Sequence, residues 1–280
     1  MNSKAMSLKA KIRNYAKDKN IAAQVVLQNY MFERFLERLS KSKYRDKFVI
    51  KGGMLIAAIL GLDTRATMDL DATLKGLPLT EEKIIKAVKE IGNIKIDDDV
   101  FFKFLSIENI RRDDEYGGFC VSLNAIYDTI ITPLSIDVST GDIITPFAVQ
   151  YEFPAIFNKN LSIKLWGYNI ETVMAEKIEA ILTLGIFNTR PRDYYDIYII
   201  ASTQKYKIDV FKKALLSTAE HRGTKENIVN KNIIINTIKN NNDIKNMWQK
   251  YQNKFFYAKQ IQFEDILKAI SNLLQKIDNN

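Results

Sequence analysis

Apolar and polar residues follow two different periods along this chain, and the changes of period divide it into regions. Apolar residues recur at helical spacing, every three or four positions, near both ends of the chain. Between these regions they alternate, as expected for half-buried strands. The helices predicted from the first period cover residues 3–18, 21–40, 80–91, 170–183, 192–203, 208–220, 225–239, 241–254 and 263–277. The strands predicted from the second cover residues 101–110, 119–126 and 130–138.

Three predictions concern where charged residues lie. In the helix over 21–40, Glu33, Arg34, Glu37 and Arg38 fall between the apolar positions, which predicts an amphipathic helix packed on a sheet. The first two predicted strands are joined by a charged turn over 111–118. The acidic run 97–99 has no apolar surroundings in the sequence, so a solvated turn is favoured over a metal site.

The stretch 48–74 organises the rest of the chain. It reads as a short strand, two glycines, a helix too short to span a bilayer, and a second strand that carries Asp69 and Asp71. Residues two apart in a strand point to the same face, so we expect both carboxylates to project together. The two negative carboxylates repel each other unless a cation binds between them, and Mg²⁺ is the cation most often bound in this way. Gly52 and Gly53 allow a tight turn in which a phosphate approaches the start of a helix.

Asp137 is the candidate for a further acid in the same site. It lies in the predicted strand over 130–138 between Ile136 and Val138, which we expect to face the core, so that the carboxylate projects from the opposite side. The alternative is an ordinary charge on an edge strand. The chain has one histidine, His221, to which we assign no chemistry, and the sequence therefore excludes metal sites built on several histidines.

Composition and charge indicate where the protein is located in the cell and which class of partner it could bind. The 280 residues carry a net charge of +8, and from Lys205 onward fourteen Lys or Arg face seven Asp or Glu. A basic region of this kind binds a phosphate backbone or keeps the protein soluble. Cys120 is the single cysteine, which excludes an internal disulfide, and neither a signal peptide nor a transmembrane run is evident. We therefore expect a cytoplasmic protein without a membrane partner.

Two prolines and a loosely patterned passage separate the strand-rich part from the helical part. Pro146 and Pro154 lie in this passage, which continues to Tyr168. The sequence therefore predicts an α+β domain over 1–168 and a helical, basic domain over 169–280.

Several of these motifs, taken in order, resemble a known family. Lys51-Gly52-Gly53 followed by Arg65-x-Thr67-x-Asp69-x-Asp71 looks like the first motif of the polymerase-β-like nucleotidyltransferases, in particular the AbiEii abortive-infection toxins. Glu176-Lys177 and the run from Arg190 to Asp196 resemble the later motifs of that family, with Arg192 at a position where lysine is common. The resemblance implies a polymerase-β-like nucleotidyltransferase domain, with a mixed sheet and flanking helices, followed by a helical bundle.

The resemblance also implies roles for the candidate residues. Asp69, Asp71 and Asp137 would hold two Mg²⁺ ions, the third acid coming from a strand beside the first two, and Lys177 would neutralise the triphosphate of the NTP substrate. Gly52 and Gly53 would cradle its β- and γ-phosphates. Further NTP contacts would be Lys51, Arg65, Thr67, Glu176, Arg190, Arg192, Asp193 and Asp196. For Asp193 and Asp196 a purely structural ion-pair network is an equal alternative, and Tyr194 and Tyr195 fit either base stacking or the core.

The family gives an expected activity and partners. Its members are toxins of toxin–antitoxin systems in phage defence, and relatives transfer NMP from an NTP to the 3′ acceptor end of tRNA, which blocks charging and growth. The antitoxin is encoded nearby and generally need not contact the toxin. Two alternatives stay open: a transferase that modifies a protein or small-molecule hydroxyl, and a non-catalytic RNA-binding protein.

Overall fold

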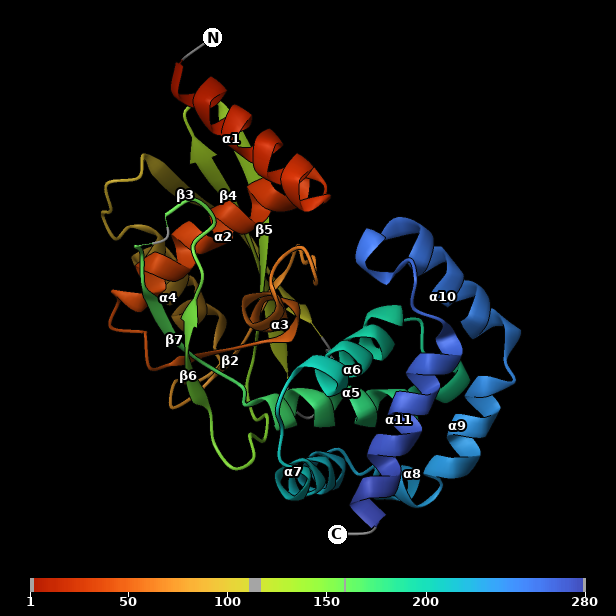
Figure 1. Cartoon of the computed structure of the whole chain (residues 1–280). Coiled ribbons are helices and arrows are strands. Elements are labelled where there is room, and N and C mark those ends of the chain that lie inside the picture. The colour runs from red at the N-terminus through yellow and green to blue at the C-terminus, as the bar shows by residue number, and fades with distance from the viewer. Residues whose placement is uncertain (1–2, 111–116, 159, 279–280) are drawn as a thin grey trace. The chain divides into compact units, whose positions relative to one another are not determined.

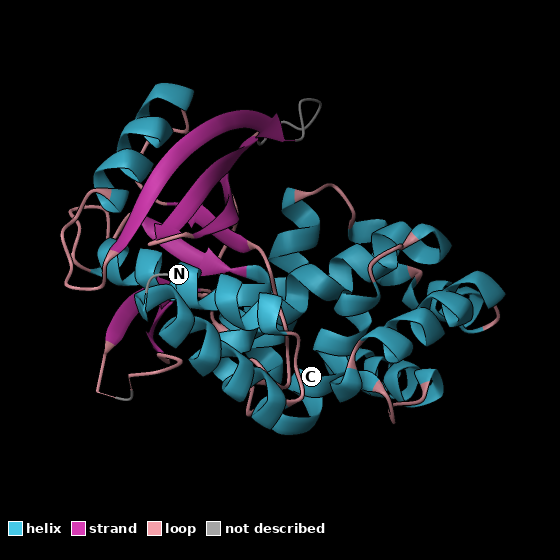
Figure 2. Cartoon of the chain, turned by 90° about the horizontal axis from the view of Figure 1, so that it is seen from above, coloured by secondary structure: helices cyan, strands magenta, loops and turns pink. Residues whose placement is uncertain are grey.

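The computed structural model describes residues 3–110, 117–158 and 160–278, and the chain divides into two compact units. Unit 1 comprises the chain up to residue 142 together with 149–167. Unit 2 comprises 143–148 and the chain from residue 168 onward. Figure 1 labels most of the elements of both units, and Figure 2 shows the strands in magenta, all of them in unit 1 among the described residues. The predicted α+β class is confirmed.

One mixed sheet of seven strands forms the centre of unit 1 as far as the structure describes it, in the order β3-β4-β5-β2-β1-β7-β6. The strands are β1 (Phe48–Lys51), β2 (Leu70–Leu74), β3 (Val100–Ile110), β4 (Gly118–Tyr127), β5 (Ile130–Ser139), β6 (Val149–Phe153) and β7 (Ile163–Gly167). The helices of this unit are α1 (Ser3–Lys19), α2 (Ala23–Ser40), α3 (Gly52–Leu60) and α4 (Glu81–Gly92).

The register of the central strands decides which side chains meet. β2 pairs antiparallel with β1 and parallel with β5. The strands predicted over 101–110, 119–126 and 130–138 are confirmed as β3, β4 and β5, which form an antiparallel meander. The predicted helix over 80–91 is also confirmed, with the Thr80 hydroxyl accepting from the backbone N–H of Lys83 at 3.4 Å. The predicted charged turn over 111–118 falls largely outside the described residues.

Three element predictions need correction. β2 begins at Leu70, so Asp69 lies one residue ahead of the strand, and Met68 and Asp69 are both exposed. β6 and β7 were not predicted, because their short segments flank prolines and polar turns. The predicted helix over 225–239 is two helices, α8 (Lys225–Val229) and α9 (Lys231–Lys239), separated at Asn230.

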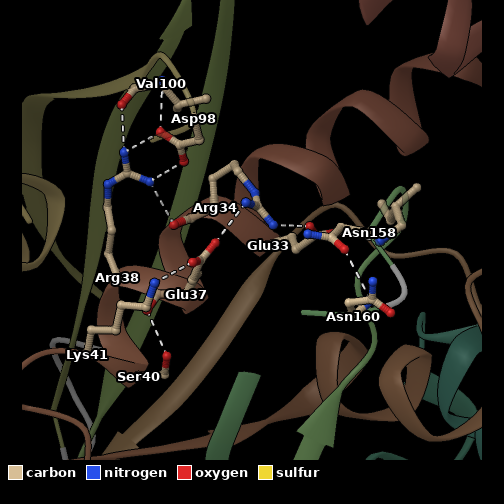
Figure 3. Close-up of polar contacts among 11 residues, drawn as sticks. Glu33, Arg34, Glu37, Arg38, Ser40, Lys41, Asp98, Val100, Asn158 and Asn160 are labelled. Carbon is tan, nitrogen blue, oxygen red and sulfur yellow. Dashed lines mark hydrogen bonds and ion pairs between the residues drawn. The ribbon is translucent and has the colours of Figure 1, made fainter. Parts of the chain in front are cut away.

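Helix α2 is buried on its charged positions as well as on its apolar ones, which corrects the amphipathic prediction. Arg34 pairs with Glu33 and Glu37, and Arg38 forms two hydrogen bonds to Asp98, at 2.7 and 2.8 Å. Figure 3 shows these side chains facing one another along the helix. Buried charges are tolerated when each has a partner of opposite sign. The network therefore lets α2 lie inside unit 1 instead of on its surface.

The acidic run 97–99 lies in a turn, as predicted, but one of its three acids is buried and not solvated. The side chain of Asp98 is 5 % exposed and accepts from Arg38, which also donates to the carbonyl of Val100 at 2.8 Å (Figure 3). Asp97 and Asp99 are exposed. Asp98 thus anchors the start of β3 to α2.

The regular elements of unit 2 are all helices among its described residues. Its elements, besides α8 and α9, are α5 (Ile170–Leu184), η1 (Gly185–Phe187), α6 (Pro191–Thr203), α7 (Ile208–His221), α10 (Asn242–Lys254), η2 (Phe256–Ala258) and α11 (Phe263–Asp278). Asn169 caps α5, and Pro191 occupies the first turn of α6. None of the helices in the described part of the chain is both long and apolar enough to cross a membrane.

Tyr194 and Tyr195 belong to the core of unit 2 and are not a base-stacking surface. Both are fully buried, and the ring of Tyr195 lies 4.9 Å from that of Tyr257, centroid to centroid. Burial also raises the pKa of Tyr194. Of the two alternatives for this pair, the structure supports packing.

Candidate active site

Asp71 and Asp137 are direct neighbours in the sheet of unit 1. They face each other in the parallel pairing of β2 with β5, which joins Leu70 to Ile136, Asp71 to Asp137 and Ala72 to Val138. The alternation of the strands buries Leu70 and Ile136 on one side, so both carboxylates project from the other side. Two acids that are far apart in sequence therefore lie side by side on the same face of the sheet.

The glycine turn lies directly against these acids. Gly52 has φ +62°, and a Cβ placed on it would lie 2.1 Å from Oδ2 of Asp71. A Cβ on Gly53 would lie 2.5 Å from Oγ1 of Thr67. Both positions therefore require glycine on steric grounds. Because Gly52 and Gly53 open helix α3, the carboxylate of Asp71 lies near the positive end of the α3 dipole.

Helix α2 positions the backbone that precedes β2. The side-chain amide of Asn29 donates to the carbonyl of Thr67 at 2.7 Å, and that of Gln28 donates to the carbonyl of Met68 at 2.9 Å. Both amides are buried. Asp69 follows immediately, so its backbone is held although its side chain is exposed.

Arg65 and Thr67 pack behind the glycine turn. Both are 3 % exposed, and Nη2 of Arg65 lies 3.4 Å from where a Cβ of Gly53 would stand. Arg65 also donates to the carbonyl of Ala66. The R-x-T-x-D stretch and the glycine turn are thus one packed unit, although nearly the whole of α3 separates them in sequence.

A cavity of about 80 Å³ opens at the two acids. Its lining comes from β1, β2, β4, β5 and the end of β3, and consists of Lys51, Asp71, Ile110, Gly117, Gly118, Asp137 and Ser139. A larger cavity of about 180 Å³ lies elsewhere in unit 1, between α1, α2, α3 and the segment after β6, and it contains none of the candidate acids. The smaller cavity is the candidate active site.

Lys51 enters this cavity from the end of β1 and is held on one side by Asp142, a residue that the sequence did not single out. Its Nζ lies 2.6 Å from Oδ2 of Asp142 and 2.8 Å from Oγ of Ser139, which in turn donates to Asp142 at 2.7 Å. Burial alone would raise the pKa of Asp142, but the charge of Lys51 and hydrogen bonds from Lys51, Ser139 and Thr73 outweigh it and lower that pKa below its usual range.

The Asp137 carboxylate keeps an unused acceptor. Its Oδ1 is buried and has no hydrogen-bond partner among the described residues. Asp137 pairs with Asp71 on one neighbouring strand and with Cys120, on β4, on the other. Burial and the nearby Asp137 carboxylate raise the pKa of the Cys120 thiol. A buried carboxylate oxygen without a donor is costly unless a cation or another donor reaches it.

As the side chains lie, the described residues contain no group of three or more His, Cys, Asp or Glu side chains arranged to hold a metal ion. Asp71 and Asp137 are brought together by register, while Asp69 stands ahead of the strand with an exposed side chain. Two of the three predicted acids, Asp71 and Asp137, therefore belong to paired strands of the sheet, whereas Asp69 lies just outside β2.

The predicted residues of the later motifs lie in unit 2. The ammonium of Lys177, on α5, lies 2.8 Å from Oδ1 of Asp193 and 2.8 Å from Oδ2 of Asp196, both on α6. Asp196 is completely buried. This ion-pair cluster joins α5 and α6, so Asp193 and Asp196 orient the ammonium of Lys177, with or without a role in NTP binding.

The remaining residues of these motifs are spread around that cluster. Glu176 pairs with Arg222 at 3.1 Å, and Arg222 also bonds to Glu179. Arg190 is exposed just ahead of α6, and Arg192 is half-buried in its first turn. Glu176 therefore has a structural partner that the sequence pattern did not indicate.

Comparison with known proteins identifies the family. Two solved structures from Helicobacter pylori share the fold: a candidate nucleotidyltransferase (14% identity, TM-score 0.54, covering 92% of this chain and 96% of that chain) and JHP933 (13% identity, TM-score 0.52, covering 92% and 93%). No curated protein matches this chain in sequence. The model of the family described as "Nucleotidyl transferase AbiEii toxin, Type IV TA system" matches residues 34–269. The chain therefore belongs to the AbiEii nucleotidyl transferase toxin family of type IV toxin–antitoxin systems.

Proposed function

We propose that this toxin transfers NMP from an NTP to the 3′ acceptor end of tRNA and releases pyrophosphate. The observation that carries the proposal is the register of Asp71 beside Asp137, with Gly52 directly against the carboxylate of Asp71. An acid pair next to a glycine turn at a helix start suits a triphosphate and its counter-ions. The family supplies the reaction class, and the basic region from Lys205 onward supports a nucleic-acid acceptor.

The residues fit a divalent cation. Oδ1 of Asp137 is buried without a donor, and carboxylate oxygens are the ligands that Mg²⁺ prefers. We assign Asp71 and Asp137 as the core ligands and Asp69, one residue ahead of β2, as the third, for two Mg²⁺ ions. A bound Mg²⁺ would lower the pKa of the attacking hydroxyl and stabilise charge on the triphosphate.

The chain's own residues then bind and orient the substrates. The first backbone N–H groups of α3, at Gly52 and Gly53, are the proposed donors to the β- and γ-phosphates, and Lys51 adds a positive charge in the same cavity. Asp137 is the proposed acceptor of the hydroxyl proton. That Lys177 neutralises the triphosphate stays a prediction, in which Asp193 and Asp196 hold its ammonium in place.

The biological consequence follows from the proposed chemistry. A tRNA with extra nucleotides at its acceptor end cannot be charged, so translation and growth stop in the cytoplasm, which suits abortive infection as a phage defence. The antitoxin partner, encoded nearby, would not need to contact the toxin.

The deciding experiment supplies every candidate acceptor at once. The protein is incubated with total RNA and each labelled NTP in turn, with and without Mg²⁺, and RNA, protein and small-molecule fractions are counted. We expect label in tRNA only, and only with Mg²⁺. Label in protein or in a small molecule would replace tRNA as the acceptor, and no label anywhere would favour a non-catalytic RNA-binding protein.

Variants of the candidate metal ligands test the site further, and a variant of an exposed acid outside the site is their control. Asp137→Asn and Asp69→Ala should each reduce transfer by about 10²-fold or more, because each removes charge stabilisation at the reacting phosphate, and should leave the fold intact. Asp97→Asn changes an exposed acid in the same unit and should transfer like the parent. Transfer by Asp137→Asn at the parental rate would remove the assignment.

A further inference from the structure

Side chains from two strands of the sheet donate to one carboxylate, that of Asp142. Lys51 ends β1 and Ser139 ends β5. The ammonium of Lys51 and the hydroxyl of Ser139 reach Oδ2 of Asp142 at 2.6 and 2.7 Å. Both donors line the candidate active site.

We propose that Asp142 is a positioning residue that holds the ammonium of Lys51 in place to meet the phosphates of the NTP. The inference rests on the proposed function. Asp142 does not line the cavity itself, so it acts through Lys51, whose side chain reaches from the cavity wall to the Asp142 carboxylate.

The physical basis is the flexibility of lysine. An ammonium on a four-carbon stem loses much rotational freedom when it is fixed on a ligand. Here that freedom is lost on folding instead, because Asp142 and Ser139 already fix the ammonium. A prepositioned cation then binds a phosphate more tightly than a mobile one, as preorganised sites generally do.

A comparison within unit 1 separates this pair from an ordinary surface ion pair. The side chains of Lys51 and Asp142 are 17% and 15% exposed and lie 2.6 Å apart. Those of Lys19 and Asp63 are 38% and 40% exposed and lie 3.3 Å apart, outside the candidate active site. The second pair is therefore a matched control for the removal of an Asp–Lys ion pair.

The test measures NTP affinity apart from chemistry. The dissociation constant of a non-hydrolysable α,β-methylene NTP, together with KM and kcat, is measured for the parent, Asp142→Asn, Asp142→Glu, Lys51→Ala, the double variant Asp142→Asn with Lys51→Ala, and Asp63→Asn. All measurements are made well below the unfolding midpoint of each variant, so that lost stability does not count as lost affinity.

We expect Asp142→Asn to weaken analogue binding about tenfold, the effect of losing one charge-assisted hydrogen bond, with a much smaller change in kcat. Asp142→Glu should recover part of the affinity, and Asp63→Asn should bind like the parent. In the Lys51→Ala background, Asp142→Asn should have no further effect, because Asp142 acts through Lys51.

Two results would overturn the inference. One is analogue binding by Asp142→Asn equal to the parent's. The other is an equal loss of affinity with and without Lys51. A parent that neither binds the analogue nor transfers nucleotides would instead remove the proposed function, and this inference with it.

Discussion

At the scale of single residues, Gly52 leaves room for the carboxylate of Asp71 because it has no side chain. Its φ is +62°, and a Cβ would stand 2.1 Å from Oδ2 of Asp71. Gly52→Ala should therefore cost about 1 kcal/mol of stability through backbone strain and, by displacing the carboxylate, reduce transfer at least about tenfold. Thermal unfolding and the labelled-NTP assay measure the two effects separately.

The control for Gly52→Ala has the same strain without the steric clash. Gly223 has φ +65° and nothing within 4 Å of its would-be Cβ. Gly223→Ala should lose a similar amount of stability and keep full activity. If both variants keep full activity, Gly52 is not needed for the geometry of the acids.

The charge on Asp142 predicts a dependence of stability on pH. Its pKa is below the ordinary value of 3.8 in the folded protein. A depressed carboxyl pKa contributes stability that is fully present above the unfolded pKa and is lost as the pH falls through the folded one. The free energy of unfolding of the parent should thus exceed that of Asp142→Asn above about pH 4, and the difference should shrink as the pH falls toward 2. Urea titrations at pH 7, 5, 4 and 3 test this; a constant difference would contradict it.

At the scale of elements, helix α2 shows that a buried helix can carry charges. Arg38 holds Asp98 and the carbonyl of Val100 and so ties α2 to the start of β3 (Figure 3). Arg38→Met should destabilise the protein by about 3–5 kcal/mol, because it leaves the carboxylate of Asp98 buried without its partner. The thermal midpoint by circular dichroism measures the loss.

The matched change for Arg38→Met removes an exposed pair beside it. Lys4 and Asp99 are 57% and 55% exposed, so Lys4→Ala should leave the midpoint unchanged. A midpoint for Arg38→Met equal to that of Lys4→Ala would show that the buried network does not hold α2 in place.

At the scale of the whole molecule, the charge of the C-terminal region is the feature that bears on the acceptor. The exposed lysines Lys239, Lys250, Lys254 and Lys259 lie in or beside α9, α10 and η2. If they bind RNA phosphates, changing all four to glutamine should weaken tRNA binding and lower the slope of log K against log[salt] by about 0.7–0.9 for each phosphate that is no longer neutralised. Filter binding at several salt concentrations measures the slope.

The same number of charges can be removed from unit 1 as a comparison. Lys9, Lys11, Lys83 and Lys86 are exposed there. Changing them to glutamine lowers the net charge equally, so a specific role for the C-terminal lysines predicts a smaller effect. Equal effects of the two sets would mean that net charge alone attracts the RNA.

The sequence by itself determined what depends on local order. Helical and alternating periods predicted most elements, and the Lys51-Gly52-Gly53 and Asp69-x-Asp71 motifs indicated the family that comparison then confirmed. These features follow from short-range physics: side-chain direction along a helix or strand, the freedom of glycine, and the repulsion of adjacent carboxylates.

Tertiary structure decided which distant residues meet. The register that sets Asp71 beside Asp137, the orphaned oxygen of Asp137 and the ion pair of Asp142 with Lys51 all depend on strand pairing, which no local pattern encodes. The buried charges of α2 have the same origin, because a polar side chain is stable inside only when another part of the chain brings its partner.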